Sequence, residues 1–162
     1  MKDAAIRALA ESEDPAALPH LLALMDKTSD LKQQVLVFRG IARLASNSRD
    51  VEESVREDAL TRALAKATRP EEKKLFLGAL GGCPTIGALK AVEPLLKSDD
   101  VAAEAVTAWG QIAKAILPKY PDDVRDAAPG VLARAQEIGV SKAAMAPLMD
   151  VMRALAAAPV PG

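Results

Sequence analysis

The sequence predicts an all-α fold of about nine helices, stacked as four to five antiparallel pairs joined by short connections. Half of its 162 residues are hydrophobic but only 2% are aromatic, and alanine and leucine supply most of the apolar side chains. This composition favours helices, because alanine has the highest helix propensity while β-branched and aromatic residues are typical of strands. Apolar residues also recur at helical spacing between short segments rich in proline, glycine, aspartate and serine.

Five helices are expected in the first half of the chain: residues 3–11, 14–27 and 30–45, then one helix behind Asp50 and one behind Thr68. Asp14-Pro15 combines an N-cap residue with a first-turn proline, and Ser29 can cap the third helix. Asp50 and Thr68 each stand three residues before a glutamate, the spacing of a capping box. The expected inward stripes of the last three helices are Leu31, Val35, Phe38 and Ala42; Val55, Leu60, Leu64 and Ala67; and Leu75, Phe76, Leu80 and Cys83.

Four more helices are expected in the second half. One begins at Pro84-Thr85 with Leu89, Val92 and Leu96 inward, and the next is capped by Ser98-Asp99-Asp100 and ended by Pro118. The last two run from Pro121 to Ile138, where Gly139 stops the helix, and from the Ser141 cap to Ala157. We therefore expect one domain over residues 1–158 and a linker-like tail over residues 159–162.

A proline recurs in corresponding helices and suggests a repeat. Pro19, Pro94 and Pro129 each precede Leu-type or Val-Leu residues, and their separations correspond to a period of 35 to 38 residues in which Glu57 replaces the proline once. Such a period is typical of stacked helix pairs. Because a proline inside a helix is costly unless it lies near the start, three in register suggest a shared bend or helix start. Pro147 falls outside this register.

At the level of residues, the segments Lys2–Ala10 and Glu13–Met25 resemble a HEAT-like repeat unit of the phycobilisome-lyase type, an armadillo-like helical repeat. They combine an Ala-rich first helix, an Asp-Pro turn and a second helix reading Pro-x-Leu-Leu. Residues 71–116 are similar to HEAT-like segments of large multidomain bacterial proteins. The resemblance implies a right-handed α-α superhelix with second helices on the concave side. It does not imply lyase chemistry.

The residues that could carry chemistry have simpler structural interpretations. His20 and Cys83, the one histidine and the one cysteine, cannot assemble a zinc site of the usual type, and we expect His20 at the surface and Cys83 packed at a turn. The acid pairs Glu52-Glu53, Glu71-Glu72, Asp99-Asp100 and Asp122-Asp123 fall in expected first helical turns, where carboxylates stabilise the helix dipole. Gly78, Gly81 and Gly82 lack the lysine and strand of a phosphate loop, so close helix packing is expected there. No metal, cofactor or small-molecule substrate is expected.

Charge and termini narrow the functional classes. With 21 basic and 22 acidic residues the net charge is −1, whereas nucleic-acid binders are commonly basic. Trp109 lies on an apolar helix face and is expected in the core. The charged start Met1–Arg7 is unlike a signal peptide, which favours the cytoplasm, or the periplasm if the chain belongs to a secreted parent.

The function predicted is a non-enzymatic interaction or scaffold module that presents a concave helical surface to a partner protein or to flanking domains. Equivalent positions on successive second helices share one surface of such a stack, so Lys90 and Arg125 would form a small basic row, with Arg62 and Arg134 in a second row. These four residues are the predicted partner-binding residues. The alternatives are a nucleic-acid-binding HEAT-like domain and a surface-site enzyme such as a DNA-glycosylase-like protein.

Overall fold

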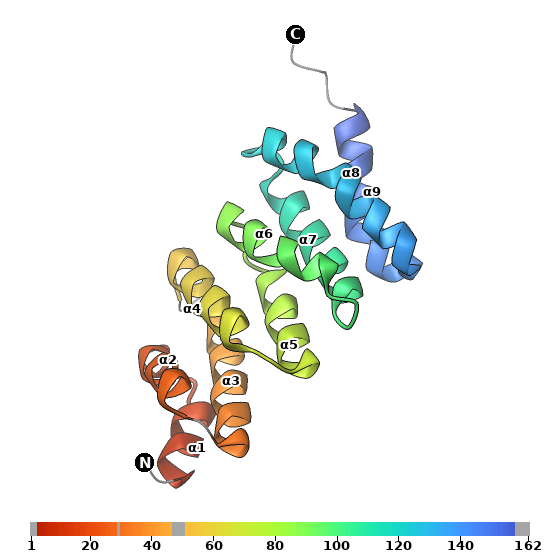
Figure 1. Ribbon diagram of the computed structural model, residues 1–162. Coiled ribbons are helices and arrows are strands. Elements are labelled where there is room, and N and C mark those ends of the chain that lie inside the picture. Colours follow the sequence, from red (N-terminus) through yellow and green to blue (C-terminus); the bar gives the residue numbers. More distant parts are fainter. Residues whose placement is uncertain (1–2, 29, 47–50, 158–162) are drawn as a thin grey trace. The chain divides into compact units, whose positions relative to one another are not determined.

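The computed structural model describes residues 3–28, 30–46 and 51–157 of the chain (Figure 1). These residues contain no β-strand, which confirms the all-α class predicted from composition and periodicity. They form nine α-helices and one 3-10 helix: α1 (Asp3–Glu11), α2 (Ala17–Lys27), α3 (Leu31–Ala45), α4 (Glu53–Lys66), α5 (Pro70–Leu80), α6 (Ile86–Val92), η1 (Glu93–Lys97), α7 (Ala102–Ile116), α8 (Pro121–Ile138) and α9 (Lys142–Ala157). By its contacts the chain divides into two compact units, Met1–Cys83 and Pro84–Gly162.

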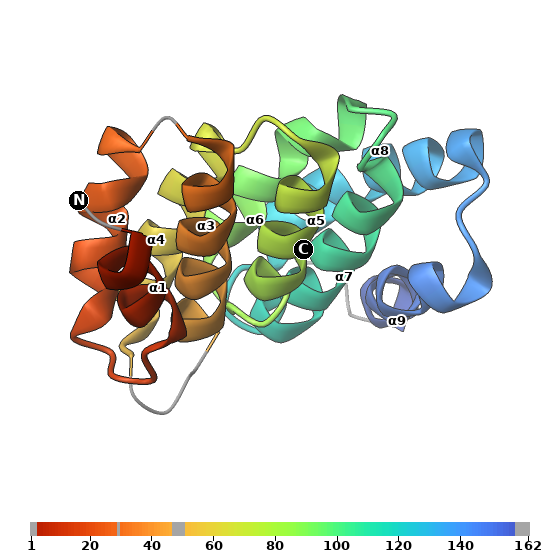
Figure 2. The ribbon, with the colours of Figure 1, turned by 90° about the horizontal axis from the view of Figure 1, so that it is seen from below.

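In the first unit the helices form two layers around α3. α1, α3 and α5 pack side by side in one layer, and α2 and α4 contact each other in the second layer (Figure 2). α3 also contacts α2 and α4, so it is the one helix that touches all the others. The rings of Phe38 on α3 and Phe76 on α5 meet edge to face with centroids 5.4 Å apart, an arrangement that aromatic quadrupoles favour. The fully buried large side chains of this unit are Ile6, Leu18, Leu21, Ile41, Leu60, Phe76, Leu77 and Leu80.

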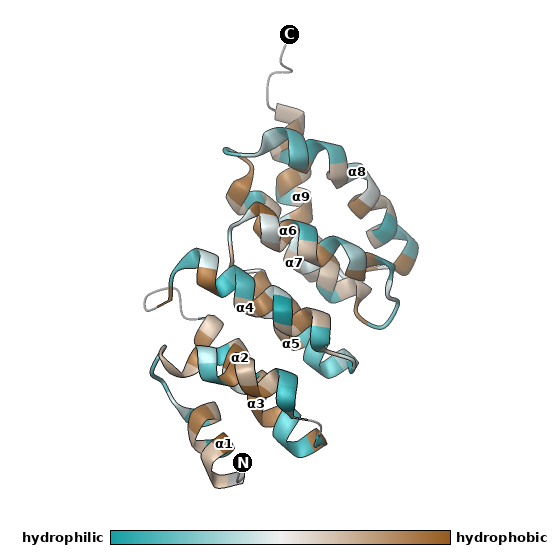
Figure 3. Cartoon of the chain, turned by 60° about the vertical axis from the view of Figure 1, so that its left-hand side comes forward, coloured by the Kyte–Doolittle hydropathy of each residue, from teal (hydrophilic) through white to brown (hydrophobic). Residues whose placement is uncertain are grey.

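The second unit is organised around α7, which contacts α6, η1, α8 and α9. Trp109 on α7 is completely buried, as its place on the apolar face predicts, and its indole N–H donates a hydrogen bond to Glu93 at 3.4 Å. The apolar face of α7 is buried from its N-cap to its last residue: Val101, Ala105, Ala108, Ile112 and Ile116. Figure 3 shows hydrophobic and hydrophilic residues alternating along the helices, as one buried face per helix requires.

Several start and stop signals act as predicted. Thr85 accepts a hydrogen bond from the Ala88 N–H at 3.0 Å, and Ser141 accepts one from Ala144 at 3.2 Å. Gly139 ends α8 in the left-handed conformation with φ 68°, where a Cβ would be strained. Pro121 is the first residue of α8.

Other caps differ from the prediction. Asp30 caps α3 by accepting from the Gln33 N–H, while Ser29 and Asp50, the predicted caps, lie outside the described residues. Ser98-Asp99-Asp100 form a turn and α7 begins only at Ala102, so that acid pair does not belong to a first helical turn. The predicted Thr68 cap is likewise replaced by Arg69, whose side chain makes no capping bond.

The three register prolines and Pro147 have different settings. Pro19 lies in the first turn of α2, Pro94 lies in η1, which follows α6 directly, and Pro129 lies inside α8. These three prolines therefore do not share one local backbone setting, and the prediction of a common bend or helix start is wrong. Pro147, for which the sequence offered no explanation, packs against Gly110: a Cβ on Gly110 would lie 2.6 Å from the Leu148 nitrogen and 3.0 Å from Pro147. The glycine thus permits a close approach of α7 and α9.

In the first unit, the buried face of some helices differs from the predicted inward stripe. Leu31, Val55 and Leu75 were expected inside, but their exposed fractions are 54%, 45% and 39%. In α4 the buried face runs through Arg56, Ala59, Leu60, Ala63 and Leu64. These positions follow the i, i+3, i+4, i+7, i+8 pattern of one helix face, so a charged residue occupies the first core position. The expected packing at Gly78 is also wrong, because nothing lies within 4 Å of a Cβ built there.

None of the helices in the described ranges is both long enough and apolar enough to cross a lipid bilayer.

Candidate functional site

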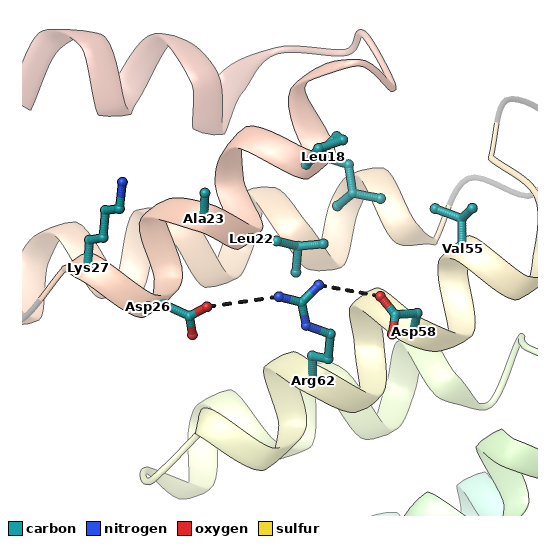
Figure 4. Close-up of a pocket in the computed structure, with 9 residues that line it drawn as sticks. Leu18, Leu22, Ala23, Asp26, Lys27, Val55, Asp58 and Arg62 are labelled. Carbon is teal, nitrogen blue, oxygen red and sulfur yellow. Dashed lines mark hydrogen bonds and ion pairs between the residues drawn. The ribbon is translucent and has the colours of Figure 1, made fainter.

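α2 and α4 of the first unit line a concave surface, called the α2–α4 groove below. It has a volume of about 540 Å³ and nine lining residues (Figure 4): Leu18, Pro19, Leu22, Ala23, Asp26, Lys27, Val55, Asp58 and Arg62. Leu18 and Val55 lie toward the start of their helices and Asp26 and Arg62 toward the end, so α2 and α4 run in the same direction.

Helix periodicity explains which side chains face this groove. On α4, Ala59, Leu60 and Ala63 are fully buried and fix the orientation of the helix. Val55, Asp58 and Arg62 are spaced by three and four residues, so they share the neighbouring face and line the groove. The sequence pattern predicts Val55 in the core. Its true place is the groove wall, where 45% of its surface is exposed.

A bridge of charges connects the two helices across the groove. Arg62 lies 3.4 Å from Asp58 on its own helix and 3.9 Å from Asp26 on α2, as Figure 4 shows. Lys66 adds a second ion pair to Asp26 at 3.4 Å. About half of each of these side chains, or more in some, is exposed, so the pairs are screened and orient the groove wall more than they stabilise it.

The floor of the groove is apolar and its accessible part is small. Leu18 is 1% and Leu22 8% exposed, because both side chains also belong to the core of the unit. Pro19 and Ala23, on the outer side of α2, are exposed. The groove therefore offers short aliphatic surface between charged walls, which suits contact with aliphatic side chains of another molecule.

Of the four predicted partner-binding residues, only Arg62 lies in this groove. Lys90 on α6 forms an ion pair with Glu93 at 3.9 Å, and Arg125 on α8 with Asp122 at 3.2 Å. Lys90 is well exposed. The structure thus places each of these three cations beside a carboxylate, and the proposed basic row of Lys90 and Arg125 stays a prediction.

Arg134, in the second unit, is the most enclosed of the four. Its side chain is 18% exposed, and it donates to Asp99 at 2.6 Å, to Glu137 at 2.8 Å and to the carbonyl of Leu96 at 2.6 Å. The hydrogen bond to Asp99 is the main reason why the pKa of Arg134 is raised above its usual value. Arg134 thereby holds the end of η1, which is a structural role.

The residues considered for catalysis have the settings that the sequence predicts. His20 is exposed on α2, and Cys83 is fully buried at the end of the first unit. In the described part of the chain no group of three or more histidine, cysteine or acidic side chains is placed to hold a metal ion.

Sequence reasoning missed a set of arginines that bind helix ends. Arg56 is 4% exposed and donates to the carbonyls of Ala45 at 2.8 Å and Gly82 at 2.9 Å, at the ends of α3 and α5. Arg43 donates to the carbonyls of Ala10 and Ser12 at the end of α1. A guanidinium is favourable there because helix C-termini carry unpaired carbonyls and partial negative charge. The spacing of Arg56 from Ala59 and Leu60 was a signal that could have found it.

No protein-family model matches the chain, and comparisons with curated proteins and with solved structures likewise gave no significant match.

Proposed function

We propose that this chain is a non-enzymatic protein-interaction module and that the α2–α4 groove receives a segment of a partner protein. The observation that carries the proposal is the groove itself: about 540 Å³ of open volume with an aliphatic floor and Val55 exposed on its wall. Exposed apolar surface enclosed by charged residues is typical of protein-binding sites. A HEAT-like stack with α2 and α4 on the concave side agrees with this use, and remains part of the proposal.

The chemistry of the groove favours a protein segment over nucleic acid. Asp26 and Asp58 line the groove beside Arg62 and Lys27, so the lining has no net positive charge. Nucleic-acid affinity depends largely on neutralising phosphates, which such a lining does not do. A flanking domain of a larger bacterial parent protein would satisfy the same contacts as a separate partner. Lys90 and Arg125 would then add a second contact surface.

Photo-crosslinking tests the proposal. Ala23, exposed in the groove, is replaced by a benzophenone amino acid, and Ala5 on the exposed side of α1 receives the same group as a matched control. We expect one protein, identified by mass spectrometry, to be crosslinked reproducibly at position 23 in cells and not at position 5. In a second variant that also carries Val55→Asp, this crosslink should be lost, because a carboxylate would be placed on the aliphatic wall.

Two outcomes would contradict the proposal. One is that positions 23 and 5 give the same adducts, since the groove would then have no preference for a partner. The other is tight binding of duplex DNA by the purified chain that weakens steeply with salt, which is the behaviour of a nucleic-acid-binding domain.

A further inference from the structure

A second cavity, of about 220 Å³, lies between α3 and α5, in the helix layer of the first unit that does not contain the α2–α4 groove. α3 contributes Val35, Phe38 and Arg39 to its lining, and the start of α5 contributes Arg69, Glu71, Glu72 and Leu75. It combines charges of both signs with an aliphatic wall. It shares no lining residue with the α2–α4 groove, and nothing below depends on the function proposed for that groove.

Glu72 is the most unusual group in this cavity. Its side chain is 7% exposed, and Oε1 accepts a hydrogen bond from Nε of Arg69 at 3.1 Å. Oε2 is buried and has no hydrogen-bond partner in the described part of the chain. A buried charged acceptor without a donor is costly, so a ligand that supplies a donor gains the corresponding energy. Because the terminal torsion of glutamate is soft, a small turn of the carboxylate can present Oε2 to a ligand.

The arginines of the cavity offer the complementary chemistry. Arg39 is exposed on α3 and forms no ion pair with any described residue. Arg69 uses Nε for Glu72, which leaves the Nη edge of its guanidinium for another acceptor. Two arginines in the lining of one cavity are suited to a carboxylate, which accepts hydrogen bonds from guanidinium groups in a planar, paired geometry.

The remaining wall is aliphatic and the total charge is balanced. Leu75 is 39% exposed and Val35 is half-buried, and both line the cavity. Arg39 and Arg69 are matched by Glu71 and Glu72, so a ligand without net charge fits the lining. The volume is below that of pockets for drug-sized ligands, which begin at about 300 Å³, so the ligand must be small.

We propose that this cavity binds a free α-amino acid with an aliphatic side chain, such as leucine. The ammonium group is bound by Glu72, and the carboxylate is bound by Arg39 and Arg69. The side chain packs on Leu75 and Val35. A chain terminus of a protein carries only one of the two charged groups, so it satisfies either Glu72 or the arginines but not both.

Isothermal titration calorimetry with L-leucine and the full chain tests this assignment. We expect a Kd of about 1 mM or tighter, in keeping with the size of the ligand. Glu72→Gln and Arg39→Gln should each weaken binding by about tenfold or more, because each removes one charged partner of the zwitterion. Glu11→Gln and Arg7→Gln, on the exposed surface of α1, are the matched controls and should leave the Kd unchanged.

Two analogues separate the free amino acid from a chain terminus. Leucinamide lacks the carboxylate and N-acetylleucine lacks the ammonium, and both should bind at least about tenfold more weakly than leucine. Absence of leucine binding, or equal binding of N-acetylleucine, would overturn the proposal, as would unchanged binding by Arg39→Gln. Since Arg39 is exposed, that variant decides the matter even if Glu72→Gln fails to fold.

Discussion

α3 in the first unit and α7 in the second occupy corresponding places but are held by different means. Each is 15 residues long and contacts every other helix of its own unit. Each also carries a glycine that allows a neighbouring helix to come close: Gly40 faces Ala10 of α1, and Gly110 faces Pro147 and Leu148 of α9.

The two helices differ in the interactions that hold their neighbours in place. Around α3, arginine side chains donate hydrogen bonds to helix ends: Arg43 binds carbonyls at the end of α1, and Arg56 from α4 binds the end of α3 itself. Around α7, the contact with α9 is made by the backbone at Gly110 and by a hydrogen bond from Thr107 to the carbonyl of Ala144 at 3.0 Å. Lys114 and Asp150 add an ion pair at 2.8 Å.

This comparison teaches that one packing scheme can be stabilised by charge at helix ends or by close backbone contact. Helix ends need partners for their last carbonyls, and a buried guanidinium supplies several donors at once. A close helix contact instead gains dispersion energy and tolerates no extra atoms. The two units should therefore respond to different substitutions.

The largest loss of stability is expected for Arg56→Met in the first unit. The variant leaves the carbonyls of Ala45 and Gly82 without their donor, and we expect the free energy of unfolding to fall by about 2–4 kcal/mol. Urea unfolding followed by far-UV circular dichroism measures it. Arg62→Met is the control, because its exposed ion pairs predict a change within about 1 kcal/mol. Equal effects in the two variants would mean that Arg56 does not hold the helix ends.

The second-largest loss of stability is expected for Gly110→Ala in the second unit. Its Cβ would lie 2.6 Å from the backbone nitrogen of Leu148, so α7 and α9 must separate, and we expect a loss of about 2–3 kcal/mol. Trp109, the single tryptophan and next to the substitution, reports the transition by fluorescence.

Gly130→Ala in α8 is the matched control in the same unit. Nothing lies within 4 Å of its Cβ, so the higher helix propensity of alanine should raise stability by about 0.5–1 kcal/mol. If both glycine variants were stabilised alike, the close contact of α7 and α9 would not exist.

A smaller effect is expected for Gly40→Ala. Here the Cβ would lie 3.0 Å from Ala10 Cα and from Leu21 Cδ1 and 3.1 Å from the Ala10 carbonyl oxygen. These contacts are less severe than the 2.6 Å contact at Gly110, so the loss should be about 1–2 kcal/mol. Gly78→Ala in α5, with open space around the new methyl, should be neutral or stabilising and serves as control. A loss for Gly40→Ala that exceeds the loss for Gly110→Ala would reverse the comparison between α3 and α7.

The smallest change in stability is expected for a substitution of Asp150, and this change depends on pH. The hydrogen bond from Lys114, with help from Arg153, holds the pKa of Asp150 below its usual value of 3.8. A lowered pKa in the folded state stabilises the protein above the unfolded-state pKa, and this contribution is lost as pH falls through the folded-state pKa. Asp150→Asn should therefore lower the urea midpoint slightly at pH 7 and leave it unchanged at the lowest pH studied. A pH-independent difference would show that the charge of Asp150 is not involved.

Local signals predicted much of this molecule from its sequence. Short-range rules predict the nine α-helices of the described residues, the caps at Thr85 and Ser141, and the end of α8 at Gly139. Those rules act through neighbours within one or two turns, so they can be read along the chain. The same rules nevertheless predict Val55 in the core, because they rank residues by hydrophobicity. They do not take into account that Arg56 can occupy a core position when its donors are satisfied there.

The candidate sites could be predicted only in part. Arg62 was selected from the sequence as part of a basic row, but its place in the α2–α4 groove depends on Asp26, 36 positions away in the chain. The α3–α5 cavity was not found at all, because Glu72 looks like an ordinary first-turn carboxylate until Phe38 and Leu75 are placed around it.

The sequence by itself thus determined the class of fold and the start and end of most helices, since backbone hydrogen bonding and side-chain periodicity are local properties. Only the tertiary structure decided which face of α4 is buried, why Pro147 stands opposite Gly110, and which charges meet in the groove and in the cavity. These features depend on the approach of helices that are distant in the chain, and the energy of such contacts is set by distances of a few ångströms that no local pattern encodes.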